Sequence, residues 1–89
     1  MAALPSHLLI SEARALKALL LGLLVEPHLT LDASGVTSVD AAGVQLLLAA
    51  ALEARARGGR LSLRAPSSAL RGALTLSGLL TELCPEEAS

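Results

Sequence analysis

The chain has 89 residues, of which 53% are hydrophobic and none is aromatic, and its net charge is −1 at pH 7. A chain of this length predicts a single small domain, residues 1–89, with a modest aliphatic core. The balanced charge and the lack of aromatic rings argue against a nucleic-acid partner, because neither a basic surface nor a base-stacking platform is available.

The sequence also argues against metal, cofactor and membrane sites. Cys84 is the one cysteine, which excludes an internal disulfide and a cysteine-built zinc site. His7 and His28 do not share a metal-binding spacing, and no nucleotide fingerprint is present. The apolar run 18–25 is shorter than the about 20 residues that span a bilayer. We therefore expect no cofactor, no direct membrane insertion and, without disulfides or a signal peptide, a cytoplasmic protein.

The N-terminal part predicts a strand followed by an apolar helix. Residues 1–5 are expected to be a frayed end or a short edge strand, and residues 7–10 a short strand. Ser11 fits a helix N-cap. The helix is expected over about 12–24, with a stripe of leucines, and it ends before Pro27 because a residue that precedes proline avoids helical geometry.

A second helix is expected over about 41–56. Its apolar stripe recurs at helical spacing in Val44, Leu47, Leu48, Ala51 and Leu52. Asp40 stands at the N-cap position, where a carboxylate accepts hydrogen bonds from free backbone N–H groups at the positive end of the helix dipole. Gly43 leaves the first turn without a side chain, so either another backbone or a partner can approach closely there.

The other segments complete an alternating order. A short buried strand is expected over 29–32, followed by a polar loop over 33–38, and a half-exposed strand over 60–64. A turn over 65–68 leads into a third helix that ends near Gly78.

Residues 79–83 fit either a last strand or a helical turn, and 85–89 fit a frayed tail. Strands separated by helices require crossovers, so we predict an α/β fold with a mixed, mainly parallel sheet of about four strands.

No catalytic set stands out along the chain. Asp32 and Asp40 are better explained as a loop anchor and a helix cap than as an acid–base pair. Ser34, Thr37 and Ser38 have no histidine or lysine nearby in the sequence to act as a base. The residues alone therefore predict binding rather than catalysis.

The run LTLDASGVTSVDAAGVQLL over residues 29–47 resembles the central signature of STAS domains, the group of anti-sigma factor antagonists and their relatives. In that signature a short strand ends near Asp, and Asp-Ser-Ser-Gly or Asp-Thr-Ala-Gly opens a helix after a loop. The resemblance covers roughly residues 8–83. It implies a small STAS-like fold with helices mostly on one face of the sheet, in a form that lacks the longer N-terminal hairpin of many members.

The resemblance also bears on regulation. In phosphorylated STAS antagonists a serine that a partner kinase modifies follows the Asp, and in the MlaB-type lipid-transport members a threonine stands there. Here the residue is Ala41, which has no hydroxyl to phosphorylate. Either binding is constitutive, or its control lies elsewhere in the chain.

Two functions from different classes follow from this resemblance. The first is a non-enzymatic interaction module that docks a signalling or regulatory protein, such as a kinase-like anti-sigma factor. The alternative is an MlaB-like cytoplasmic accessory subunit that braces the ATPase of a phospholipid-transport ABC transporter. An enzyme fragment or orphan fold and a homodimer also stay open. The expected partner-binding residues are Ser34, Thr37, Ser38, Asp40, Ala41, Ala42, Gly43, Val44 and Leu47.

Overall fold

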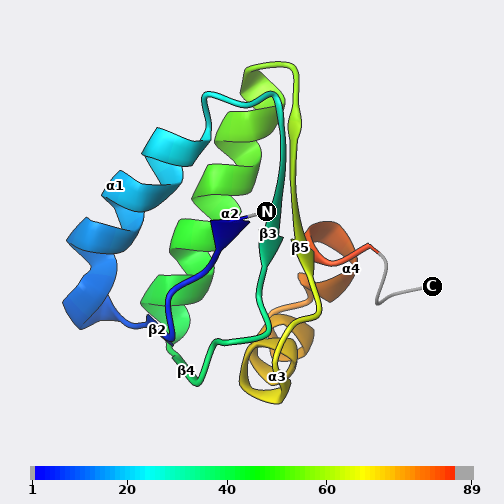
Figure 1. Ribbon diagram of the computed structural model, residues 1–89. Helices are drawn as coiled ribbons and strands as arrows, with labels where there is room; N and C mark the ends of the chain where they lie inside the picture. Colours follow the sequence, from blue (N-terminus) through cyan, green and yellow to red (C-terminus); the bar gives the residue numbers. More distant parts are fainter. Residues whose placement is uncertain (1, 86–89) are drawn as a thin grey trace.

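The computed structural model describes residues 2–85 and has the alternating order of strands and helices that the sequence predicts (Figure 1). The elements are β1 (Ala2–Ala3), β2 (His7–Leu8), the 3-10 turn η1 (Ile10–Glu12), α1 (Ala13–Leu23), β3 (His28–Asp32), β4 (Ser38–Val39), α2 (Ala41–Ala56), β5 (Arg60–Arg64), α3 (Ser68–Leu76) and α4 (Leu80–Leu83). The α/β fold class is confirmed.

The described strands form two sheets rather than the one mixed sheet of about four strands that we predicted. One sheet has the order β1-β3-β5 and the other pairs β2 with β4, and every pairing is parallel. The chain passes between the sheets at Pro5, which has no N–H with which to extend a ladder. On one side of it Leu4 N–H still bonds to the Asp32 carbonyl of the first sheet, and on the other the Ser6 carbonyl accepts from Thr37 in the second.

One face of the three-stranded sheet is buried. Exposure alternates along β3 and β5, with Leu29, Leu31, Leu61 and Leu63 buried and their neighbours open or half-open to solvent. These leucines belong to the same core as the inner faces of α1 and α2, and α2 packs against β5. In Figure 1, α1 and α2 lie side by side to the left of the strands and α3 and α4 follow β5 to the right, and α3 also contacts α2. No polar or charged side chain is buried among residues 2–85.

The N-terminal part differs from the prediction in detail. The strand that we expected over 7–10 covers only His7–Leu8, and Ser11 lies inside η1 instead of capping a helix. The reason is a contact distant in sequence: Ile10 N–H bonds to a carboxylate oxygen of Asp40, which draws the chain into a 3-10 turn before α1 begins. Residues 1–5 were expected to be either a frayed end or a short edge strand, and the edge strand is observed, as β1.

The C-terminal half follows the prediction closely. Helix α2 spans Ala41–Ala56, and Gly58 and Gly78 stop their helices in the left-handed region, with φ of +83° and +72°. Ser67 caps α3 by accepting a bond from Leu70 N–H. The ambiguous stretch 79–83 is a helical turn, α4, and an Arg55–Glu82 ion pair ties it to α2. The expected frayed tail lies outside the described residues from 86 onwards.

Candidate functional site

Asp40 is the polar centre of the start of α2. Its Oδ1 accepts a hydrogen bond from Gly43 N–H at 3.0 Å, which confirms the predicted N-cap. Its Oδ2 accepts from Ile10 N–H at 2.9 Å, and its own N–H donates to the Leu8 carbonyl at 3.1 Å. The bond from Ile10 and then that from Gly43 lower the pKa of Asp40 below its ordinary value of 3.8. One carboxylate thus joins α2 to the segment that leads into α1.

Gly43 makes a close approach inside the domain. A Cβ at this position would lie 2.0 Å from the carbonyl oxygen of Leu8, so no side chain fits. The sequence left open whether another backbone or a partner approaches here, and the backbone of β2 does so. The expectation that Gly43 is exposed is wrong, because β2 pairs with β4 and crosses the first turn of α2.

The predicted site residues separate into an outer and an inner set. Ser34, Thr37 and Ala41 are exposed, and Ser38, Asp40 and Ala42 are half-buried. Gly43, Val44 and Leu47 are buried, the last at 0% exposure, so the expectation that they lie at a partner-binding surface is corrected: they lie in the interior beneath the start of α2. Their spacing along the helix puts these three residues on the side of α2 that faces the interior of the domain.

The loop before α2 is held by its own polar groups. Asp32 accepts a hydrogen bond from Ser34 N–H at 2.9 Å, and this bond, the largest effect on the group, lowers the pKa of Asp32. Thr37 Oγ1 donates to the Ser6 carbonyl at 3.2 Å. These bonds fix the loop against the N-terminal segment, so the exposed hydroxyls stand on a defined backbone.

Two residues at this end of the molecule were missed by the sequence reasoning. Ile10 is 71% exposed, although Asp40 holds its backbone. His7 Nδ1 lies 2.8 Å from Ser38 Oγ. The statement that no histidine lies near these hydroxyls therefore holds in sequence only, because the parallel pairing of β2 with β4 aligns His7 with Ser38. No local pattern signals a contact between residues so far apart.

We define the tip as the outer set without the capping Asp40 and with Ile10 added: Ile10, Ser34, Thr37, Ser38, Ala41 and Ala42. Ile10, Ala41 and Ala42 give it apolar surface, and the three hydroxyl residues give it polar groups. The His7–Ser38 pair is a histidine beside a hydroxyl, but within residues 2–85 no carboxylate is hydrogen-bonded to its second ring nitrogen as an orienting group. No cluster of three metal-ligating side chains occurs in this part of the chain. The arrangement offers contact surface.

The comparisons with known proteins are informative at the level of the family. The family model described as "Mlab, STAS domain" matches residues 3–85, which include every element from β2 to α4 and all of the tip. No curated protein matches the chain. None of the helices described is long and apolar enough to cross a membrane.

Proposed function

Because the chain belongs to the MlaB-type STAS domain family, we propose that it is a non-enzymatic docking module whose tip binds another protein. STAS domains are generally regulatory modules without enzymatic activity, and they typically interact with proteins. The proposal assigns this general role to one surface of this chain.

The observation that carries the proposal is the way Asp40 presents a small-residue helix start. Its two carboxylate oxygens hold Gly43 and Ile10 in place, while Ala41 remains exposed and Ala42 half-exposed beside them. A partner can therefore approach the helix backbone without moving a large side chain. Ile10, at 71% exposure, adds an aliphatic anchor of the kind found at the centre of protein interfaces.

The tip lacks a phosphorylation switch at its expected position. Ala41 directly follows the capping Asp40, where a hydroxyl would receive a phosphate of about −2 charge next to the helix start. Without that hydroxyl, either docking is constitutive or its control lies elsewhere in the chain.

Two classes of partner fit such a module: a kinase-like regulator and the ATPase of a phospholipid-transport ABC transporter. The match to the family described as "Mlab, STAS domain" supports the ATPase. The order Ala42-Gly43 also resembles the Thr-Ala-Gly of that group more than Ser-Ser-Gly. We place this interaction in the cytoplasm, where either partner has its soluble face.

Affinity capture from the native host, with partners identified by mass spectrometry, tests the proposal. Ala41→Glu adds a bulky charge to the tip, and we expect its main partner to fall by at least about tenfold, the loss that one buried unpaired charge causes. Ala56→Glu places the same change on an exposed residue at the far end of α2 and serves as the matched control. If Ala41→Glu retains the partner at the level of the control, the tip is not the docking surface.

A further inference from the structure

A second feature of the surface lies between α1 and α2. A hollow of about 180 Å³ opens there. The floor of the hollow is aliphatic, and one cationic and one anionic side chain flank it. Its lining residues are Lys17, Leu20, Leu21, Leu46, Ala49, Ala50 and Glu53. Leu21 remains 44% exposed at its rim.

The solvent side of α2 is unusually apolar around this hollow. Beyond the first turn, the exposed aliphatic positions on the helix are Ala49, Leu52 and Ala56, and Leu52 is 54% exposed. Between 41 and 56 only Gln45, Glu53 and Arg55 are polar or charged. These three residues are exposed, but the aliphatic positions between them and the groove with α1 form an apolar surface that is suited to contact with a protein.

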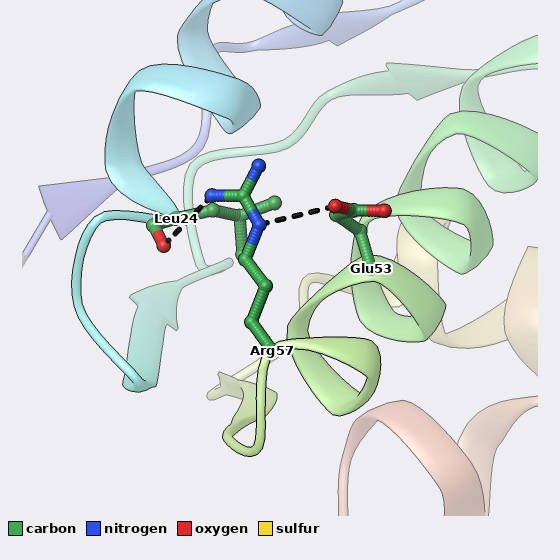
Figure 2. Close-up of polar contacts among 3 residues, drawn as sticks. All are labelled: Leu24, Glu53 and Arg57. Carbon is green, nitrogen blue, oxygen red and sulfur yellow. Dashed lines mark hydrogen bonds and ion pairs between the residues drawn. The ribbon is translucent and has the colours of Figure 1, made fainter.

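The two charges lie toward opposite ends of this face. Helices α1 and α2 run in the same direction in Figure 1, with Lys17 in the first half of α1 and Glu53 in the last turns of α2. Figure 2 shows how Glu53 is held: Arg57 Nε donates to its Oε1 at 3.0 Å, and Arg57 Nη1 donates to the Leu24 carbonyl at 3.3 Å. Lys17 makes no ion pair with another residue in the described range 2–85, and it takes no part in the Arg55–Glu82 or Arg57–Glu53 pair.

We propose that a second copy of this chain covers the face, in a two-fold symmetric dimer. In such an interface each contact occurs twice, so a surface pairs with itself only if it carries its own complement. This face does: Lys17 of each copy meets Glu53 of the partner subunit at the two ends, and the aliphatic walls meet at the centre. The second oxygen of Glu53 is available because Arg57 uses only Oε1.

The size of the face sets the expected affinity. A standard interface covers about 800 Å² of each partner, roughly a sixth of the 4845 Å² surface of this chain. The hollow and its rim make up part of that area, so we expect a reversible dimer with a micromolar dissociation constant. The proposal is independent of the function assigned to the tip, which lies at the start of α2.

Sedimentation equilibrium of the whole chain between about 1 and 200 μM tests the dimer in the range where a micromolar constant is measurable. The parent is expected to shift from monomer to dimer across this range. Ala49→Glu places a charge in the wall of the hollow and should weaken association by at least about tenfold. Ala69→Glu makes the same change at an exposed position of α3, away from α1 and the outer face of α2, and should leave association unchanged. Ala41→Glu, at the tip, should do so as well. Thermal melts show whether each variant is folded.

A charge-reversal cycle tests the pairing itself. Lys17→Glu and Glu53→Lys should each weaken the dimer, and the double variant should recover most of the lost association, since the two charges are exchanged across the interface. A parent that stays monomeric at the highest concentration would overturn the proposal. So would a dimer that is insensitive to Ala49→Glu, a double variant without recovery, or a monomer whose hollow instead binds a different protein.

Discussion

The substitution Gly43→Ala tests how the start of α2 is packed. Alanine is favoured over glycine inside a helix by about 1 kcal/mol, so local propensity alone predicts a stabilised protein. The structure predicts the opposite. The new Cβ would lie 2.0 Å from the Leu8 carbonyl oxygen and 2.7 Å from its carbonyl carbon, against an ordinary separation of about 3.5–4.0 Å.

Both of those atoms are backbone, so the contact cannot be relieved by rotating a side chain. Helix α2 or strand β2 must move by more than 1 Å (roughly the difference between the two separations), which disturbs the pairing with β4 and the bonds of Asp40. Overpacking of this kind costs typically about 1–3 kcal/mol or more. After the gain in helix propensity is subtracted, we expect a net loss of up to about 2 kcal/mol, which at that upper end is about 8–16 °C in Tm for a domain of this size.

Urea unfolding followed by far-UV circular dichroism measures this loss, with the slope of the transition checked for constancy. Gly72→Ala is the matched control, because Gly72 lies inside α3 and a Cβ there meets nothing within 4 Å. The control should gain up to about 1 kcal/mol. If Gly43→Ala is as stable as the parent or more so, the close approach of β2 to α2 is wrong.

The remaining predictions concern the core and the cap. Leu47→Ala removes a side chain with 0% exposure and should cost about 2–5 kcal/mol in urea unfolding, whereas Leu52→Ala, at a position 54% exposed, should cost far less. Equal losses would contradict the placement of α2. The lowered pKa of Asp40 predicts a stabilising effect that is present above its ordinary value of 3.8 and is lost as pH falls through the lower folded-state value. The Tm difference between the parent and Asp40→Asn should therefore be constant at neutral pH and shrink in acid; a difference that does not change with pH would show that the charge of Asp40 contributes nothing.

The features that sequence reasoning recovered are those set by residues near one another in the chain. The bounds of α2, its cap at Asp40 and the stop at Gly78 each follow from a local pattern of apolar spacing, capping and backbone freedom. The same holds for the alternating strand β5. These local signals were enough to identify the α/β fold.

The features that it missed depend on contacts distant in sequence. Strand β4 was expected to be part of a loop, and β2 is shorter than the strand predicted over 7–10. Each of these two-residue strands completes the other's hydrogen bonds. Ser11 has the side chain of a cap, yet the bond from Ile10 N–H to Asp40 decides the local geometry. Gly43 was wrongly expected to be exposed for the same reason. The sequence of a helix start without side chains is the same whether the protein's own backbone or a partner packs against it.

The position of the tip could be predicted from the sequence, but the full set of residues that form its surface could not. The pattern around Asp40 identified the loop and the helix start, and Ala41 and Ala42 are indeed at the surface. Ile10 precedes α1 in the sequence, and only the fold brings it close to Ala41 and Ala42. Which aliphatic residues of a helix face outward likewise depends on its neighbours, as the 54% exposure of Leu52 in α2 shows.

Site-specific photo-crosslinking in the native host tests the central claim most directly, because it reports contact rather than stability. A photoreactive side chain introduced at Ala41 should form an adduct with one other protein, and mass spectrometry of the adduct should identify a transporter ATPase or a regulatory kinase. The same probe at Val25, which is 80% exposed at the opposite end of α1, should give no such adduct. A probe at position 41 that yields no adduct, or the same adducts as position 25, would contradict the account.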